Sequence, residues 1–405
     1  MKSFFIVVFL LAIFIILSSN VIAQDWWPMF HHDTCHTGYS TSTAPDTCEV
    51  NWSYTTSGDV HSSPAVVNGK VYVGSFDNNI YCLDASNGDS IWSYLTGDDI
   101  YSSPAVVNGK VYVGSRDGKV YCLDASNGDS IWCFTTASPV NSSPVIVDNR
   151  LYVGSNNSNI YCLNASNGSL IWIYLTGHVV WSSPAVSDGR LYVGSFDGKV
   201  YCLNTSNGDS IWCYTTNGII YSSPTVADGK VYVGSNNGNI YCLNALNGDS
   251  VWSYTTAAYG VWSSPAVADG KVYIGGGDDD NVYCLNASNG NFVWSFSAGN
   301  SVISSPAVAD GKVYIGSEDN NLYCLRASNG DSIWSYTTGG NVQSSPSAAN
   351  GRVYVGSVDN NIYCFGPSGQ QVPTLSEWGM LIMALLLLAA GTVAVVRRRK
   401  AAVRT

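Results

Sequence analysis

The chain repeats one pattern of 40 or 41 residues eight times. Each copy opens with Ser-Ser-Pro and continues through a Tyr-Cys pair. The triplets begin at Ser62, Ser102, Ser142, Ser182, Ser222, Ser263, Ser304 and Ser344. A fixed period of this size indicates an array of supersecondary units, none of which buries its apolar face without its neighbours. The repeat therefore predicts one large domain, although 405 residues would by length alone allow several.

A single repeat contains four short apolar runs separated by turn residues. In the copy spanning residues 62–101 the runs cover residues 64–67, 71–73, 80–83 and 91–94. Asn68-Gly69, between the first two runs, favours the type I′ turn of a tight hairpin. β-branched and aromatic residues fill the runs, and no part of the repeat has the period or length of a helix. Each repeat is therefore predicted to form a four-stranded antiparallel meander, and radial repetition of such sheets gives a β-propeller.

Two landmarks give the number of blades and show how the ring closes. The Cys of the Tyr-Cys pair occurs eight times, at Cys82, Cys122, Cys162, Cys202, Cys242, Cys284, Cys324 and Cys364. The Trp of the fourth run also occurs eight times, at Trp52, Trp92, Trp132, Trp172, Trp212, Trp252, Trp294 and Trp334. Trp52 precedes the first repeat, and the last repeat stops without a Trp. We therefore predict an all-β, eight-bladed propeller of four-stranded blades over residues 49–367, closed by the N-terminal strand around Trp52.

The fourth run and the turn before it carry a family resemblance. The segment from Cys82 to Trp92 resembles the tryptophan-docking motif of the pyrroloquinoline-quinone-like (PQQ-like) propellers. Asp84, Gly88 and Trp92 match that motif, whereas Cys82 and Asn87 replace its Ala and Thr. The start of a lead-in segment, residues 24–48, is also similar to this family, through Trp27-Pro28-Met29-Phe30. The resemblance implies that every docking Trp is structural, packed between its own Gly and the small first residue of a neighbouring motif.

Both ends of the chain carry export and membrane signals. Residues 1–23 have the basic start, apolar run and small-residue end of a secretory signal peptide, with an uncleaved anchor as the alternative. No Cys follows the run, which argues against lipoprotein processing. Residues 380–396 are almost wholly apolar and precede a basic tail, residues 397–405. This pattern predicts a transmembrane helix with the tail in the cytoplasm and the propeller outside it.

The segment before the apolar run, residues 368–379, combines a linker with a second motif. This stretch resembles the bacterial C-terminal sorting signals that begin Ile-Pro-Thr-Leu and are read by exosortase-type proteases. The residues that carry it are Val372, Pro373, Thr374, Leu375, Ser376, Glu377 and Trp378, with Val372 in place of Ile. The resemblance implies sorting to the bacterial cell surface, and a permanent single-span anchor is the alternative.

The 12 cysteines raise the question of disulfides in an exported chain. One Cys per blade at equal radius leaves equivalent residues too far apart to bridge, so most are read as buried apolar residues beside a Trp. If Asn127-Gly128 is a two-residue turn, Cys122 lies opposite Cys133, and the same register pairs Cys202 with Cys213. Cys35 and Cys48, both in the lead-in, are a third candidate pair.

The position before each Ser-Ser-Pro varies from copy to copy while the strands stay the same. It is occupied by His61, Tyr101, Asn141, Trp181, Tyr221, Trp262, Ile303 and Gln343. These residues begin the inner strands, so we expect them to surround one opening of the channel, where propellers carry function. Aromatic and amide groups there suit a sugar, a planar ligand or a peptide. The alternative is that they only plug the channel.

Catalytic and metal-binding patterns are weak in this sequence. Relatives that oxidise substrates with PQQ and Ca²⁺ carry adjacent cysteines, a calcium-binding acid–amide set and a catalytic Asp, whereas the eight variable positions contain no carboxylate. Asp278, Asp279 and Asp280 form a weak Ca²⁺ candidate, with a solvated turn as the alternative. We therefore expect no cofactor and no catalysis, and we keep a PQQ- and Ca²⁺-dependent oxidoreductase as the alternative.

The net charge of −11 includes five basic residues within the last nine positions, so the propeller itself is more acidic than the total indicates. An acidic body argues against nucleic acid as a partner. Together these features predict an exported, surface-displayed, monomeric propeller that binds or scaffolds a protein, peptide or glycan. An outer-membrane-assembly type of scaffold is a further alternative.

Overall fold

The computed structural model describes residues 26–367. The predicted signal peptide, sorting motif, transmembrane helix and basic tail lie outside the described residues. Among residues 26–367, no helical segment has the length and apolar character of a membrane span.

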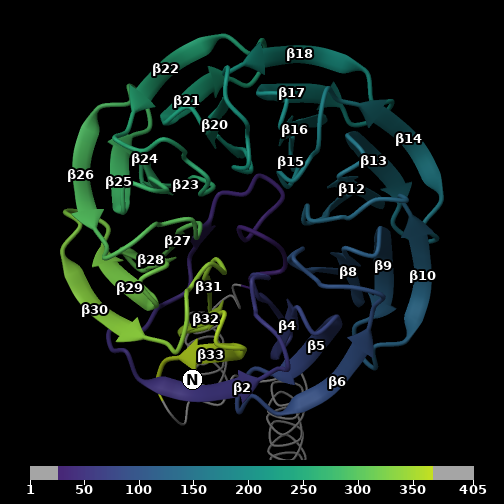
Figure 1. Cartoon of the computed structure of the whole chain (residues 1–405), viewed down its shortest axis with the longest axis horizontal. Coiled ribbons are helices and arrows are strands. Elements are labelled where there is room, and N and C mark those ends of the chain that lie inside the picture. Colours follow the sequence, from purple (N-terminus) through teal and green to yellow (C-terminus); the bar gives the residue numbers. More distant parts are fainter. Residues whose placement is uncertain (1–25, 368–405) are drawn as a thin grey trace, which may run out of the picture.

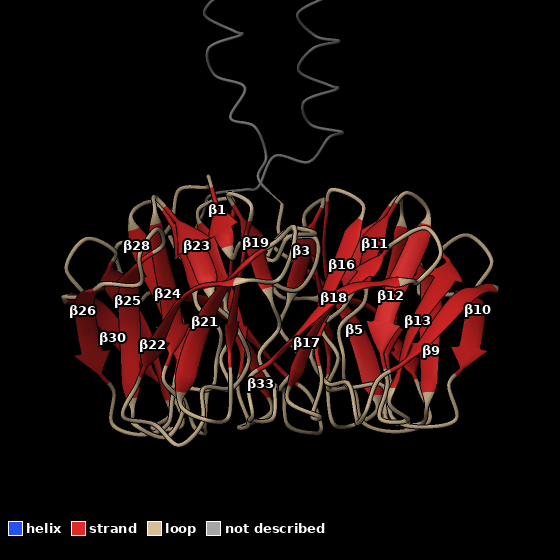
Figure 2. Ribbon diagram, turned by 90° about the horizontal axis from the view of Figure 1, so that it is seen from above, coloured by secondary structure: helices blue, strands red, loops and turns tan. Residues whose placement is uncertain are grey.

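Eight antiparallel sheets stand around a central axis, as Figure 1 shows from one end and Figure 2 from the side. Seven of the sheets have four strands, and one has a fifth strand added at its inner edge. This arrangement confirms the predicted all-β, eight-bladed propeller. Chain order runs around the ring, so each blade packs against the blades before and after it in sequence.

Strands at equivalent places in the blades have nearly equal lengths. The inner strands are β3 (Ala65–Val67), β7 (Ala105–Val107), β11 (Val145–Val147), β15 (Ala185–Ser187), β19 (Thr225–Ala227), β23 (Ala266–Ala268), β27 (Ala307–Ala309) and β31 (Ser347–Ala349). The second strands are β4 (Lys70–Gly74), β8 (Lys110–Gly114), β12 (Arg150–Gly154), β16 (Arg190–Gly194), β20 (Lys230–Gly234), β24 (Lys271–Gly275), β28 (Lys312–Gly316) and β32 (Arg352–Gly356).

The third strands are β5 (Asn79–Asp84), β9 (Lys119–Asp124), β13 (Asn159–Asn164), β17 (Lys199–Asn204), β21 (Asn239–Asn244), β25 (Asn281–Asn286), β29 (Asn321–Arg326) and β33 (Asn361–Phe365). The outer strands are β6 (Ser90–Leu95), β10 (Ser130–Thr135), β14 (Leu170–Leu175), β18 (Ser210–Thr215), β22 (Ser250–Thr255), β26 (Phe292–Ser297), β30 (Ser332–Thr337) and β2 (Val50–Thr55). In the first hairpin Asn68 and Gly69 have φ values of 52° and 73°, as the expected type I′ turn requires.

The ring closes with a strand from each end of the propeller. The outer strand β2 pairs antiparallel with β33, and Trp52 lies opposite Cys364. The last blade therefore combines three strands from residues 347–365 with one from residues 50–55, as the displaced Trp series predicts.

The docking tryptophans form a belt between blades. A Cβ added at Gly128 would lie 2.7 Å from the ring of Trp92, so this Gly leaves room for the indole of the preceding blade. The same indole donates to the carbonyl of Ala125 at 3.3 Å, and Tyr72 donates to that carbonyl at 3.1 Å. The expectation that each Trp packs on its own Gly is therefore wrong, because the Gly contacted belongs to the next blade.

The lead-in segment is part of the propeller, which the sequence did not reveal. Its backbone carbonyls accept hydrogen bonds from the inner strands of several blades. These bonds are Pro28 O from Val106 N, Thr34 O from Val186 N, Cys35 O from Val226 N, Thr37 O from Val267 N and Gly38 O from Val308 N, at 2.6–2.8 Å. The strand β1 (Tyr39–Ser40) then pairs in parallel with β27. The segment thus lies inside the ring of inner strands, as the purple trace in Figure 1 shows.

The lead-in also completes the final blade junction. The last blade has no turn joining its third strand to an outer strand, because that outer strand is β2. The carbonyl of Pro45 takes the place of the missing turn carbonyl and accepts from Tyr314 at 2.9 Å and from Trp334 at 3.4 Å. All eight docking indoles therefore find a carbonyl acceptor, seven from turns of the next blade and one from the lead-in.

The proposed disulfides are wrong. Cys122 lies opposite Trp132, and Cys133 lies opposite Tyr121, because a β-bulge between Ser130 and Trp132 shifts the register of the hairpin. The second hairpin is shifted in the same way, so Cys213 lies opposite Tyr201 rather than Cys202. In both pairs one Cys is buried and the other is exposed. The one-residue shift in register places their side chains on opposite faces of the sheet. Cys35 and Cys48 are free thiols as well.

Candidate functional site

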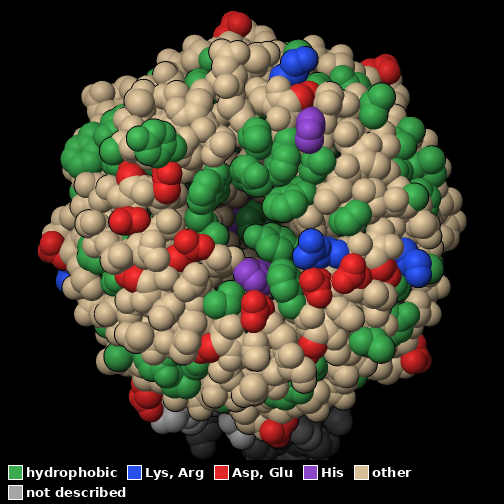
Figure 3. All heavy atoms as spheres, viewed as in Figure 1, with side chains coloured by type: hydrophobic (Ala, Val, Ile, Leu, Met, Phe, Trp, Pro, Cys, Tyr) green, Lys and Arg blue, Asp and Glu red, His purple; other side chains and the backbone are tan. Residues whose placement is uncertain are grey.

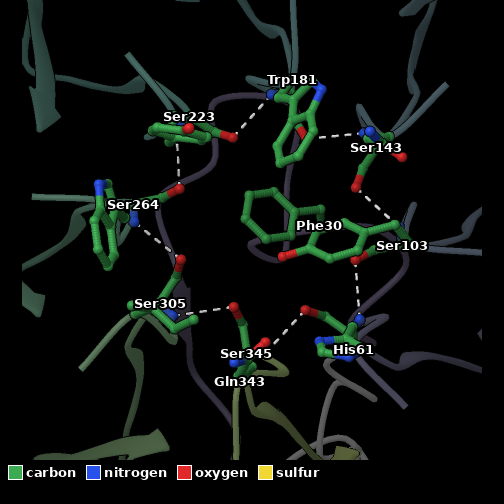
Figure 4. A pocket seen from close by; sticks show the side chains of 17 residues that line it. Phe30, His61, Ser103, Ser143, Trp181, Ser223, Ser264, Ser305, Gln343 and Ser345 are labelled. Atoms are coloured by element: carbon green, nitrogen blue, oxygen red, sulfur yellow. Dashed lines mark hydrogen bonds between the residues drawn. The ribbon is translucent and has the colours of Figure 1, made fainter. Parts of the chain in front are cut away.

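The axial pocket begins with a closed ring of serines. The second Ser of each triplet accepts a hydrogen bond through Oγ from the backbone N–H of the equivalent Ser in the preceding blade. The accepting residues are Ser63, Ser103, Ser143, Ser183, Ser223, Ser264, Ser305 and Ser345, with distances of 2.9–3.1 Å. Figure 4 shows this ring, which we call the serine ring. It fixes the start of every inner strand relative to its neighbours.

All eight variable residues lie on the same pocket. They line a cavity of about 340 Å³ together with the serine ring and Phe30. We call His61, Tyr101, Asn141, Trp181, Tyr221, Trp262, Ile303 and Gln343 the axial ring. Because each lies two residues before a serine of the ring, the repeat places them at equivalent positions around the axis. Whether they bind a ligand stays a prediction.

Five members of the axial ring form a continuous aromatic arc. His61 stacks on Tyr101 at 5.5 Å between centroids, and Tyr101 reaches Trp181 at 6.1 Å across the smaller Asn141. Trp181 meets Tyr221 at 5.6 Å, and Tyr221 meets Trp262 at 6.3 Å. The arc covers one side of the opening, where Figure 3 shows hydrophobic side chains gathered around the hollow. Ile303 and Gln343 occupy the other side.

The lead-in provides the floor of the pocket. Phe30 lies within the serine ring in Figure 4 and stacks on His31 at 4.8 Å. His31 and His36 are each only 1% exposed. Burial lowers the pKa of His31 to about 3 and the pKa of His36 to about 4, so both are neutral at pH 7. The resemblance singled out Phe30 as part of a family motif, but sequence reasoning did not place it in the site.

A second ring of side chains supports the axial ring and was also missed. It consists of the residues that follow the second strands, namely Phe76, Arg116, Asn156, Phe196, Asn236 and Glu318. Phe76 stacks on His61 at 4.3 Å, and Asn236 accepts from the Trp262 indole at 2.7 Å. This position varies between copies as the axial ring does, so the same comparison of repeats would have found it.

Charge at the site comes from groups behind the lining. Of the described residues that line the pocket, none is Asp, Glu, Lys or Arg. Asp59 lies 3.7 Å from Nε2 of His61, and Glu318 accepts from Gln343 at 2.6 Å. Asp99 is paired with Arg116 at 3.2 Å. Burial lowers the pKa of His61, so its ring is neutral at pH 7.

The acidic side chains of the weak Ca²⁺ candidate make local hydrogen bonds. Asp278 accepts from the backbone of Tyr259 at 2.9 Å, and Asp279 accepts from the hydroxyl of Tyr283 at 2.6 Å. Among the described residues no group of three His, Cys, Asp or Glu side chains could hold a metal ion. The carboxylates of this turn make local hydrogen bonds and do not converge on one point.

Eight blades locked by a Trp–Gly belt around an axial pocket define a PQQ-like β-propeller. The family model described as "Beta-alanine-activating enzyme, beta-propeller" matches residues 107–312, just over half of the chain, and the chain belongs to this β-propeller family. The model described as "Outer membrane protein assembly factor BamB" matches residues 36–101 and 278–372. The IPTL-CTERM motif matches residues 370–400, which confirms the resemblance of the tail to a sorting signal. No curated protein is significantly similar in sequence.

Solved structures share the fold at low sequence identity. BamB from Moraxella catarrhalis is 19% identical with a TM-score of 0.69, and the match covers 79% of this chain and 100% of that one. Quinohemoprotein alcohol dehydrogenase from Comamonas testosteroni is 16% identical with a TM-score of 0.77, and the match covers 88% and 82%. The computationally designed Ika8 protein is 16% identical with a TM-score of 0.72, and the match covers 79% and 100%. These similarities show the fold alone.

Proposed function

We propose that this chain is an exported, non-catalytic binding module, displayed at the bacterial surface, that holds a protein, peptide or glycan at its axial pocket. One observation carries the proposal. All eight copies of the variable position before Ser-Ser-Pro line a single cavity, and five of them form an aromatic arc. Aromatic walls with a few polar groups are typical of ligand sites.

The tail and the family support the proposed setting. A sorting motif at residues 370–400 fits a chain that is delivered to the cell surface. Similarity to an outer membrane protein assembly factor favours a protein as the partner, and keeps an assembly scaffold as a second candidate function.

A PQQ- and Ca²⁺-dependent oxidoreductase is the competing function, since a quinohemoprotein dehydrogenase shares the fold. The donor set at the pocket does not fit that cofactor. An anionic quinone and a divalent cation need basic groups and carboxylates in the lining, whereas the described lining residues supply neither. Asp59 and Glu318, which are acidic, lie behind the neutral lining.

The test screens the purified full chain, kept in detergent, against glycans, peptides and envelope proteins. Ligands that depend on the pocket lose affinity by about tenfold or more in Trp181→Ala, because an interface aromatic is removed. Leu175→Ala is the matched control, since this outer-strand residue is 71% exposed and remote from the pocket. The proposal fails if every ligand found binds both variants like the wild type.

A second experiment tests whether the chain binds the cofactor of a PQQ-dependent oxidoreductase. The chain is incubated with PQQ and Ca²⁺, and the absorbance of bound cofactor is measured after gel filtration. We expect no retained cofactor. Stoichiometric uptake that is lost in Trp181→Ala overturns the non-catalytic proposal.

A further inference from the structure

We propose that the axial pocket recognises an organic cation, an ammonium or guanidinium group such as the end of a basic side chain. This inference rests on the proposed function and specifies its ligand. Three independent features of the site carry it: the aromatic arc, the carboxylates behind it, and a buried acceptor without a partner.

The aromatic arc offers several ring faces to one small volume. Trp181 extends toward Phe30 in Figure 4, and both rings line the same cavity as Tyr101, Tyr221 and Trp262. The π face of Trp or Tyr attracts a cation through the quadrupole of the ring, most strongly where water is displaced. Several such faces around one cavity recognise an ammonium group better than any single ring does.

The charge around the pocket favours a cation over an anion. Asp59 touches His61 and Glu318 touches Gln343, so two carboxylates lie directly behind members of the axial ring. The charge of Arg116 is engaged by Asp99 at 3.2 Å. Burial is the main cause that raises the pKa of Tyr101, another member of the axial ring. The charge of Glu318 is the second cause. The charge of Glu318 therefore acts on a ring of the aromatic arc as well as on Gln343.

Asn141 supplies the polar contact. This residue is 7% exposed and lines the pocket between Tyr101 and Trp181. Its Nδ2 donates to Asn156 at 3.4 Å, whereas its Oδ1 has no hydrogen-bond partner among the described residues. A buried acceptor of this kind is costly unless a donor satisfies it. An N–H of a bound ammonium or guanidinium group would do so.

The serine ring, together with the buried Nε1 of Trp181 that also has no hydrogen-bond partner among the described residues, is the strongest argument for a different ligand. A hydroxyl that accepts a hydrogen bond still has a proton to donate, so the ring presents donors to the pocket. Donors alone would suit an anion, but the two carboxylates behind the axial ring oppose one. Donors beside a cation site instead suit the carbonyl groups that accompany a basic side chain in a peptide.

The test titrates the full chain in detergent with capped single amino acids. Nα-acetyl-arginine amide and Nα-acetyl-lysine amide are compared with their neutral counterparts, the citrulline and norleucine amides. Binding is followed by calorimetry and by the intrinsic tryptophan fluorescence of the chain, compared between the wild type and Trp181→Ala. We expect the cations to bind about tenfold more tightly than the neutral counterparts, with affinity that falls as salt is added. Equal affinity for citrulline and arginine overturns the inference, as does no binding of either cation.

Two further probes distinguish the possible ligands of the pocket. Methylammonium or methylguanidinium that binds as tightly as the capped amino acids assigns the site to small free cations, and weaker binding assigns it to basic side chains. Inorganic phosphate that binds more tightly than any cation overturns the inference.

Variants link the binding to the residues. Glu318→Gln keeps the shape of the side chain and removes its charge, so we expect it to weaken cations several-fold and leave neutral ligands unchanged. Trp181→Ala weakens cations about tenfold, and Leu175→Ala changes nothing. Near-ultraviolet circular dichroism confirms that each variant is folded. If a neutral glycan or peptide binds and Trp181→Ala abolishes its binding, the proposed function stands and only the cation inference fails.

Discussion

The Trp belt and the axial ring occupy the same repeat, yet they differ in how far the copies resemble one another. Every complete copy has the same Trp, and in seven of eight junctions that Trp contacts the next blade through one carbonyl and one Gly, whereas Trp334 donates to Pro45 of the lead-in. The axial ring has six different residue types at eight positions. Belt residues must fit a neighbouring blade, whereas axial residues face a cavity that imposes no common shape.

This contrast separates scaffold from site without reference to other proteins. A position that repeats is held by contacts that all blades share, such as the pairing of Trp212 with Cys202 and its docking on Gly248. A position that varies while its backbone stays fixed is released from those contacts. In the axial ring these released positions converge on one pocket at the axis.

The first prediction compares one Trp from each region. Trp212→Ala removes a belt indole that is 9% exposed and donates to Ala245 at 3.1 Å. We expect a loss of about 3–5 kcal/mol in the free energy of unfolding, as for a large buried aromatic. Trp181→Ala in the axial ring leaves an open pocket instead of a sealed cavity, so we expect less than half of that loss. Urea unfolding, followed by circular dichroism, measures both. Equal losses would mean that the axial ring is as structural as the belt.

The second prediction concerns acid stability and the lead-in. His31 and His36 have pKa values of about 3 and about 4 in the folded chain because they are buried. In the unfolded chain both titrate near 6.5. Between these values the unfolded state holds more protons, so stability falls as the pH drops below about 6.5. Each His contributes up to about 1.4 kcal/mol per pH unit in that window.

The control for this prediction is the double variant His31→Asn and His36→Asn. Both positions have positive φ, 53° and 57°, which Asn tolerates better than most residues. We expect the slope of unfolding free energy against pH, between pH 6.5 and 4, to be shallower in the variant. Carboxylates affect both proteins alike, so the difference between the slopes isolates the histidines. Identical slopes would contradict the burial of these side chains.

Most of the fold could be predicted because it follows from local patterns repeated eight times. Asn68-Gly69 indicated a hairpin, and the displaced position of Trp52 indicated how the ring closes. The lead-in could not be predicted in this way. Its contacts with the inner strands use backbone carbonyls such as those of Thr34 and Thr37, and backbone hydrogen bonds leave no pattern in the side chains.

The axial ring was found through its variation, but its surroundings were not. Glu318 lies next to Gln343 because the end of a second strand reaches the start of the next blade, and this contact spans 25 residues of sequence. The disulfide hypothesis failed for a related reason. It assumed a regular hairpin, and the bulge between Ser130 and Trp132 changes which residues face each other.

The last prediction tests that register and has the smallest expected effect. If Cys122 and Cys133 were bridged, reduction would lower the free energy of unfolding by about 2–4 kcal/mol. Because they are free, we expect dithiothreitol to change it by less than about 0.5 kcal/mol.

In the native protein a thiol reagent should modify Cys133 and Cys213, which are exposed, and spare Cys122 and Cys202. The spared thiols are fully buried, and burial raises the pKa of Cys122 to about 11, so little reactive thiolate is present. Mass spectrometry of peptides identifies the labelled sites, and Cys133→Ser should remove one site without a change in stability. Protection of Cys133 to the same degree as Cys122 would show that the outer strand is one residue out of the register described, because a one-residue shift turns Cys133 to the buried face.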